Sequence, residues 1–105
     1  MTGIHFVYRL IPPRPTFATD MSESEQAIMG RHAVYWTDLF EQGRAALFGV
    51  VMDQAGAWGL AVVEADAEEE VQAIAAGDPA VTSGLCTVAI GLMPQATVRP
   101  RHQAA

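Results

Sequence analysis

The stretch AALFGVVMDQAGAWGLAVVEA (residues 45–65) decides the fold, because it contains two consecutive strands. Its apolar runs, AALFGVV and AWGLAVVEA, are joined by MDQAG, a short Asp- and Gly-containing connection that is typical of a hairpin. Gly49 and Gly59 lie inside these runs and indicate a bulge or a close backbone approach. We therefore expect an antiparallel strand pair at the centre of the chain.

A long helix is expected before this strand pair. Ser22 and Glu25 have the Ser-x-x-Glu spacing of a capping box, in which each satisfies a backbone N–H at the helix start. Apolar side chains then recur at three- and four-residue steps until Gly43 provides a stop. The face that they form consists of Ile28, His32, Tyr35, Trp36, Leu39 and Phe40. A titratable ring therefore sits in the middle of an apolar helix face.

A second, shorter helix is expected after the pair. Asp66 and Glu69 make a cap-like pair, and AEEEVQAIAA (residues 67–76) continues as a helix that ends at Gly77. The following segment, DPAVTSG (residues 78–84), has the composition of a turn. In the sequence, one helix thus precedes the central strand pair and another follows it.

Two further strands lie outside these helices. IHFVYRLI (residues 4–11) is rich in aromatic and β-branched residues and stops at Pro12 and Pro13. Both alternating sets of its side chains are largely apolar, so we expect it to be covered on both faces. LCTVAIGLM (residues 85–93) is the last strand and is expected to end before Pro94.

The resulting β-α-β-β-α-β order predicts an α+β, ferredoxin-like domain, in which an antiparallel sheet carries both helices on one face. We expect a single domain over residues 1–94 and a loosely ordered tail over residues 95–105. The second sheet face would be bare and apolar in a monomer. We therefore expect a homodimer in which two sheet faces meet.

The 105-residue chain is acidic, with a formal net charge of −6, and its six basic residues are all Arg. Because phosphate neutralisation drives most nucleic-acid affinity, this charge argues against a nucleic-acid partner and against anionic membrane surfaces. No stretch has the length of a membrane span and the start lacks signal-peptide features, so we expect a cytoplasmic protein. The single Cys86 allows no intramolecular disulfide and is expected to be a small buried hydrophobe.

Several segments together resemble the YCII-related (YciI-like) family of the dimeric α+β barrel superfamily. They are RLIPPRPTFATDM, MGRHAVYW, GRAALFGVVMDQAGAWGLAVVEA and AAGDPAVTSGL, followed by LMP, and the resemblance covers nearly everything from His5 to Pro94. It implies a dimeric α+β barrel with an active site made of a helix histidine and the aspartate of an Asp-Pro motif. These fall on His32 and Asp78. Val50 departs from the pattern, which has Pro after Gly49.

The residues themselves support a meeting of His32 and Asp78. Asp78 follows a helix C-terminus, where a carboxylate needs a nearby cation, and Pro79 favours an extended backbone that projects Asp78 out of the helix. If the two meet, the carboxylate holds one ring nitrogen and leaves the other to act as general base or acid. The alternative is a core histidine bonded to a backbone carbonyl and an aspartate that merely starts a turn.

Several further residues are candidates for substrate binding, with Arg9, Tyr8 and Trp36 the main ones. Arg9, on a central strand, needs an acceptor or a water-filled pocket, and it either binds a substrate carboxylate or phenolate or extends to solvent. Tyr8 and Trp36, with Tyr35 and Trp58, line an aromatic pocket or simply form the core. Arg14, in the proline loop, reaches a cleft anion or remains a solvated charge.

The sequence offers no support for a metal site or a cofactor. His5, His32, His102 and Cys86 lack the close spacing of structural zinc ligands, and no Gly-rich phosphate cradle or nucleophile elbow occurs. Some characterised members of the YCII-related family are dehydrochlorinases of hydroxylated aromatic compounds. The resemblance to this family therefore implies a lyase-type elimination or isomerisation by proton transfer. A non-catalytic homodimeric module that binds a metabolite or acts as an accessory subunit stays open, as does, by superfamily analogy alone, a cofactor-free monooxygenase.

Overall fold

The computed structural model describes residues 2–99, which form one four-stranded antiparallel sheet and its covering helices. In chain order the elements are β1 (Thr2–Ile11), α1 (Phe17–Asp20), α2 (Glu23–Glu41), β2 (Ala45–Asp53), β3 (Gly56–Glu64), α3 (Glu68–Gly77), α4 (Pro79–Thr82) and β4 (Thr87–Thr97). The strand order is β2-β3-β1-β4, and every pair is antiparallel. The α+β, ferredoxin-like prediction is confirmed, while the one-turn helices α1 and α4 were not predicted.

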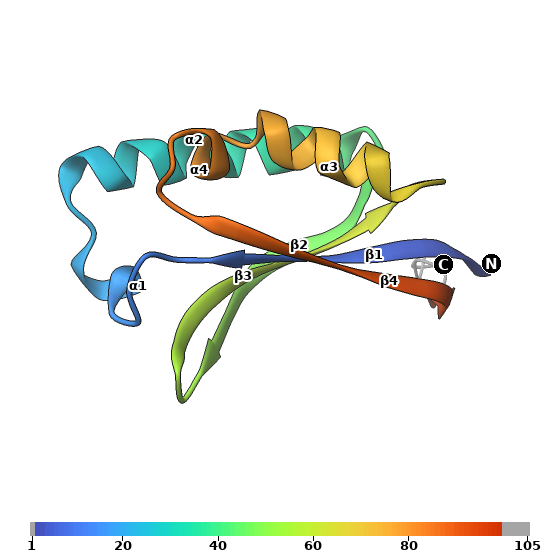
Figure 1. Cartoon of the computed structure of the whole chain (residues 1–105), viewed down its shortest axis with the longest axis horizontal. Coiled ribbons are helices and arrows are strands. Elements are labelled where there is room, and N and C mark those ends of the chain that lie inside the picture. Colours follow the sequence, from blue (N-terminus) through green and yellow to red (C-terminus); the bar gives the residue numbers. More distant parts are fainter. Residues whose placement is uncertain (1, 100–105) are drawn as a thin grey trace, which may run out of the picture.

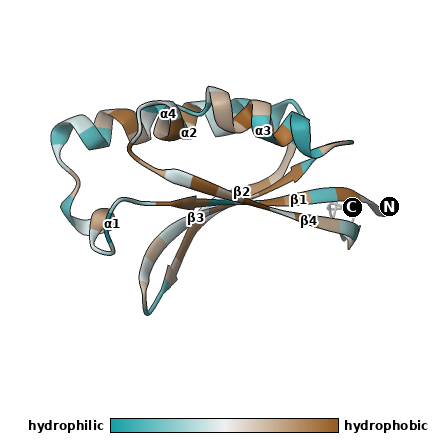
Figure 2. Ribbon diagram, viewed as in Figure 1, coloured by the Kyte–Doolittle hydropathy of each residue, from teal (hydrophilic) through white to brown (hydrophobic). Residues whose placement is uncertain are grey.

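The helices lie on one side of the sheet and leave the other side bare. Figure 1 shows α2, α3 and α4 above the strands, whereas α1 lies at the end of β1, near the hairpin of β2 and β3. Phe6, Tyr8 and Leu10 face the helices and are buried, whereas Arg9 and Ile11 point to the bare face and are exposed. Figure 2 shows hydrophobic colouring along the strands, as expected for a sheet with two apolar faces.

The central hairpin follows the sequence-based prediction closely. Asp53 pairs with Gly56, so only two residues make the turn. A Cβ added at Gly59 would lie 3.1 Å from the Cβ of Leu10, which confirms the expected close approach there. Nothing lies within 4 Å of the same position at Gly49, and the irregular register of β2 falls between residues 45 and 47 instead.

The two main helices begin differently. In α2 the Ser22 hydroxyl accepts from the Glu25 amide at 3.2 Å, and the Glu25 carboxylate accepts from the Ser22 amide at 2.8 Å, as the capping box predicts. The expected Asp66–Glu69 pair is wrong. The helix α3 has Ala67 at its cap, so Glu70 is the residue whose carboxylate returns to the amides of Ala67 and Asp66, at 3.0 and 2.6 Å.

The last strand is longer than predicted. β4 continues through Pro94 to Thr97, so residues 95–97 are strand and the expected end before Pro94 is wrong. β4 is an edge strand that pairs with β1 alone, and its register shifts where Pro94 lies. A proline, which lacks an N–H donor, is tolerated at an edge or a bulge. Residues 100–105 of the expected tail lie outside the described residues.

Substitution of Gly56 by alanine should destabilise the domain by roughly 1–3 kcal/mol, because a left-handed backbone disfavours a side chain. Gly56 has φ +122°, and an added Cβ would lie 2.7 Å from the carbonyl oxygen of Pro15. Gly30→Ala is the matched control, because Gly30 is an exposed residue of α2 with open space around it. Urea unfolding should show a lower midpoint for Gly56→Ala and no loss for Gly30→Ala. Equal midpoints would contradict this reading of the turn.

Candidate active site

Asp78 occupies the joint between two helices. It ends α3 and precedes Pro79, the first residue of α4, with φ −74° and ψ 119°, the extended conformation that the following proline favours. The sequence-based interpretation treated Asp78 as the start of a turn after a helix. The structure shows a new short helix there, and its Ala80 amide donates to Oδ1 of Asp78 at 2.9 Å.

Four donors surround the fully buried carboxylate of Asp78. Oδ1 accepts from the Ala80 amide and lies 2.8 Å from Nδ1 of His32, and Oδ2 accepts from the Tyr8 hydroxyl and from Nε1 of Trp36, both at 2.9 Å. These donors come from β1, α2 and α4. The sequence-predicted His32 and Asp78 are therefore in direct contact, and each carboxylate oxygen has two partners.

This environment keeps Asp78 ionised. Burial, the largest single influence, would by itself raise the pKa of the Asp78 carboxyl. The hydrogen bonds from His32 and Trp36, the charge interaction with His32 and the bond from the Ala80 amide act in the opposite direction and prevail, so the pKa lies below its ordinary value. Asp78 therefore acts as an acceptor that orients its donors.

Tyr8 and Trp36 make a contact that the sequence did not suggest, and their expected role in substrate binding stays a prediction. Their rings line the cavity beside His32, but their polar atoms are engaged by Asp78. Burial, reinforced by the charge of Asp78, raises the pKa of the Tyr8 hydroxyl, so this group stays protonated and donates. Burial and the same charge raise the pKa of the Cys86 thiol to about 11, which agrees with the small buried hydrophobe predicted from the sequence.

His32 is held at one nitrogen and free at the other. A carboxylate only accepts, so the proton between the two groups belongs to Nδ1, and the neutral ring then presents Nε2 as an acceptor. The contacts of residues 2–99 give Nε2 no hydrogen-bond partner. The side chain is 18% exposed and lines a cavity, which makes Nε2 the atom available to a bound molecule.

The cavity has a volume of about 310 Å³ and lies between α2, the helix-facing side of the sheet and the segment that contains α1. Its other walls are mainly apolar and include Leu10, Phe17, Met21, Met29, Phe48 and Trp58. No Arg, Lys, Asp or Glu side chain is among its lining residues. Among the described residues, the surface beside Nε2 of His32 is therefore largely apolar.

Arg9 is not brought to His32. It neighbours Tyr8 in β1 and therefore points to the opposite face of the sheet, where its guanidinium lies 4.6 Å from the centre of the Trp58 ring. It lines a second cleft of about 220 Å³, together with Asp53 and Arg14. Arg9 is thus not among the described residues that line the His32 cavity, and its expected role in substrate binding stays a prediction.

The structure also bears on the expectations about metal ligands, the other two histidines and membrane-spanning helices. Among residues 2–99 no three His, Cys, Asp or Glu side chains lie together in a way that could hold a metal ion. His5 lies on β1 with Nε2 3.4 Å from a Glu64 oxygen, and His102 lies outside the described residues. No helix in the described part of the chain combines the length and hydropathy that crossing a membrane requires.

Comparison with protein families matches the YCII-related domain over residues 6–93. The chain belongs to the YCII-related family. Among solved structures, it is similar to 5-chloro-2-hydroxyhydroquinone dehydrochlorinase from Burkholderia phenoliruptrix in complex with 2,5-dihydroxybenzoquinone, with a TM-score of 0.54, 16% identity and coverage of 95% of both chains. At this identity the likeness shows the fold. A search of the curated proteins finds no match.

Replacement of Asp78 by asparagine should destabilise the domain by about 3 kcal/mol, because the amide presents one NH2 group to donors that need an acceptor. The lowered pKa of Asp78 fixes the pH dependence. A carboxyl with a lowered folded-state pKa adds stability above its unfolded value, near 3.9, and loses it as the pH falls through the folded-state value.

Urea unfolding at a series of pH values checks this prediction. Wild type should lose stability steeply below about pH 4, and Asp78→Asn should lose less over the same window. Asp38→Asn, an exposed change on α2, is the control and should follow wild type. Parallel curves for wild type and Asp78→Asn would contradict an ionised, stabilising Asp78.

Proposed function

We propose that this protein is a lyase-type enzyme in which His32 transfers a proton to or from a small, hydroxylated ring compound. The observation that carries the proposal is the asymmetry of His32: Nδ1 is bound to a buried carboxylate, whereas Nε2, beside an apolar cavity, has no hydrogen-bond partner among residues 2–99. A histidine so oriented is a suitable general base. The pair can move a proton by itself, so the proposed reaction uses no cofactor.

The proposed reaction is an elimination. Nε2 takes a proton from the bound molecule, the electron pair left behind forms a double bond, and the leaving group departs with its own bonding pair. The imidazolium that forms is stabilised by the Asp78 carboxylate 2.8 Å from Nδ1. Isomerisation follows the same first step, except that the proton returns at a different carbon. Asp78 is the positioning residue in both cases.

The choice of ring compound is supported by the cavity and by the structural neighbour. The apolar walls favour a planar, uncharged molecule over a phosphate or a carboxylate. The neighbour is a dehydrochlorinase of a chlorinated, hydroxylated ring and was captured with a dihydroxybenzoquinone. A chlorinated hydroxyhydroquinone is therefore the first substrate to test.

We assign the enzyme to the cytoplasm, as the sequence indicates, with neither a nucleic acid nor a membrane as a partner.

The proposed elimination can be tested by measuring chloride release from 5-chloro-2-hydroxyhydroquinone. His32→Ala should lower the rate by about 100-fold or more, because general-base catalysis contributes at least that factor. Asp78→Asn should also lower it, and the exposed control Asp38→Asn should leave it near wild type. Binding of 2,5-dihydroxybenzoquinone, followed by calorimetry, should survive His32→Ala, because the apolar walls remain.

The same experiment separates the alternative. A wild-type protein that binds 2,5-dihydroxybenzoquinone but releases no chloride, with binding retained in His32→Ala, would favour a non-catalytic ligand-binding or accessory module. Turnover that persists in His32→Ala would exclude His32 as the base while leaving the protein an enzyme.

We also propose that the protein is a homodimer through the bare sheet face. Val7 pairs with Val62 on that face, and Leu60 lies opposite Arg9, so apolar side chains continue across two strands beside one Arg. A second copy would cover it, and a two-fold interface would place the same residues on both sides. The Arg9 guanidinium has no ion pair with a described residue and would be available to the partner.

Sedimentation equilibrium tests the dimer. Wild type should be a dimer at micromolar concentration, and Val62→Glu should be a monomer, because a carboxylate would be buried in the interface. Val34→Glu is the matched control, because Val34 is exposed on α2, away from the bare face. A wild-type monomer, or dissociation by both variants alike, would count against this interface.

A further inference from the structure

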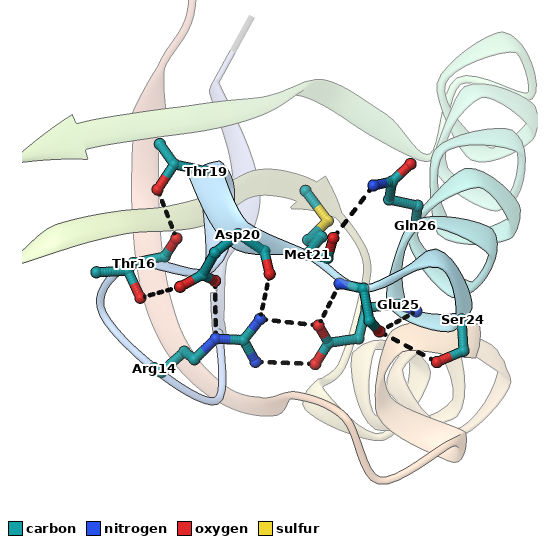
Figure 3. Close-up of polar contacts among 9 residues, drawn as sticks. Arg14, Thr16, Thr19, Asp20, Met21, Ser24, Glu25 and Gln26 are labelled. Carbon is teal, nitrogen blue, oxygen red and sulfur yellow. Dashed lines mark hydrogen bonds and ion pairs between the residues drawn. The ribbon is translucent and has the colours of Figure 1, made fainter.

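The guanidinium of Arg14 makes four hydrogen bonds to two residues that follow it in the chain. Nε donates to Oδ1 of Asp20 at 2.8 Å, and Nη2 donates to the Asp20 carbonyl oxygen at 2.9 Å. Nη1 and Nη2 donate to the two carboxylate oxygens of Glu25, at 2.9 and 2.8 Å (Figure 3). Arg14 therefore makes four hydrogen bonds, and its guanidinium also lies 5.3 Å from the centre of the Phe17 ring.

These contacts close a loop of the chain. Asp20 ends α1, whereas Glu25 lies in the first turn of α2 and completes its capping box. Arg14 thereby joins the proline loop after β1 to the ends of both helices. Thr16 adds a hydroxyl bond to Oδ2 of Asp20 at 2.6 Å (Figure 3). Besides the bonds within α1 itself, the Phe17 amide donates to the Arg14 carbonyl and the Thr19 amide donates to the Thr16 carbonyl.

The segment held by Arg14 is also a wall of the His32 cavity. Pro12, Phe17, Ala18 and Met21 all line that cavity, and Phe17 is buried. The sheet contributes no ladder bond to residues 12–21, since β1 ends at residue 11. Arg14 therefore supplies four of the hydrogen bonds that hold this wall, and two of them reach Glu25 of α2, where Gln26 adds a bond to the Met21 carbonyl.

The ion pair stays formed over a wide pH range. The hydrogen bond from Arg14, with the bond from the Ser22 amide next in size, lowers the pKa of Glu25 to about 2. Thr16 and Arg14 likewise lower the pKa of Asp20. Both carboxylates are thus charged at neutral and mildly acidic pH, and salt is the more effective way to weaken their attraction to Arg14.

We propose that Arg14 is a positioning residue that fixes residues 12–21 as a wall of the cavity and so controls which molecules reach Nε2 of His32. When its bonds break, the wall moves away from α2 while the sheet and the core helices stay folded. Arg14 itself touches no reacting atom. The inference rests on the proposed function only in naming His32 as the group that is reached.

Hydrogen exchange of the full chain tests whether Arg14 holds residues 12–21 in place. In Arg14→Gln the amides of Phe17 and Thr19 should exchange roughly tenfold faster, while those of β1 and β3 keep their wild-type rates, because local opening is separate from global unfolding. Glu25→Gln should act in the same direction, since it keeps a capping-box side chain but removes the charge opposite Arg14. Arg44→Gln, the control, removes an exposed Arg beyond the far end of α2 and should change neither set of amides.

Acrylamide quenching tests access to the cavity. The chain has two tryptophans, Trp36 and Trp58, so Trp58→Phe leaves Trp36, which is buried beside His32, as the reporter. Adding Arg14→Gln should raise the quenching constant severalfold, Arg14→Lys should restore part of the protection, and Arg44→Gln should have no effect. High salt should raise quenching in the parent and have little further effect in Arg14→Gln.

Two results would overturn the inference. One is unchanged exchange and unchanged quenching in Arg14→Gln, which would show that the wall holds without Arg14. The other is a uniform rise in exchange over β1, β3 and residues 12–21, which would reduce Arg14 to a contributor to global stability. Neither readout uses a substrate, so a failure here is distinct from a failure of the proposed chemistry.

Discussion

The ionised, fully buried carboxylate of Asp78 is the constraint on which the rest of the structure depends. A charge without water is costly unless donors replace its hydration, and here four donors do so. They are supplied by Tyr8 of β1, His32 and Trp36 of α2, and the Ala80 amide of α4. Because one small group must satisfy all of them, its position fixes the sheet and two helices relative to one another.

The same constraint produces the chemical asymmetry of the site. Asp78 occupies one nitrogen of His32, and the second nitrogen, beside the apolar cavity walls, has no hydrogen-bond partner in the described part of the chain. The group that aligns the helices is thus the group that orients the ring. Tyr8 and Trp36 contribute in the same indirect way, because their donated bonds keep the carboxylate an acceptor. Stability and orientation of the histidine are therefore coupled through a single residue.

The sequence predicts the order of elements well because that order depends on local patterns. Strand alternation, the Ser22–Glu25 capping box and the stop at Gly43 are each visible within a few residues. The meeting of His32 and Asp78 also followed, from the Asp-Pro spacing and the family resemblance. The sequence did not predict that the last strand continues from Pro94 to Thr97, because an edge position and a bulge are properties of the assembled sheet.

What local patterns could not predict is the direction of polar atoms across the core. Both alternating sets of β1 are apolar, so the sequence could not decide whether Tyr8 or Arg9 faces the helices. The donation from Tyr8 to Asp78 joins residues 70 positions apart and depends on the packing of the whole sheet. Knowing only that the buried carboxylate needed donors, one could have sought a Tyr or Trp on the helix-facing side, which is a physical signal that the sequence does carry.

The polar groups around the cavity differ in how they are held, and this difference has a chemical consequence. The side chains of His32 and Asp78 are 18% and 0% exposed, whereas those of Arg14 and Asp20 are 35% and 48% exposed. Salt screens exposed charges far more than buried ones. Under our proposal, the wall that meets the entering molecule is thus fixed by interactions that solvent can weaken, whereas salt screens the contact between His32 and Asp78 less. In the proposed enzyme, proton transfer and selection of the molecule could then change independently within one small domain.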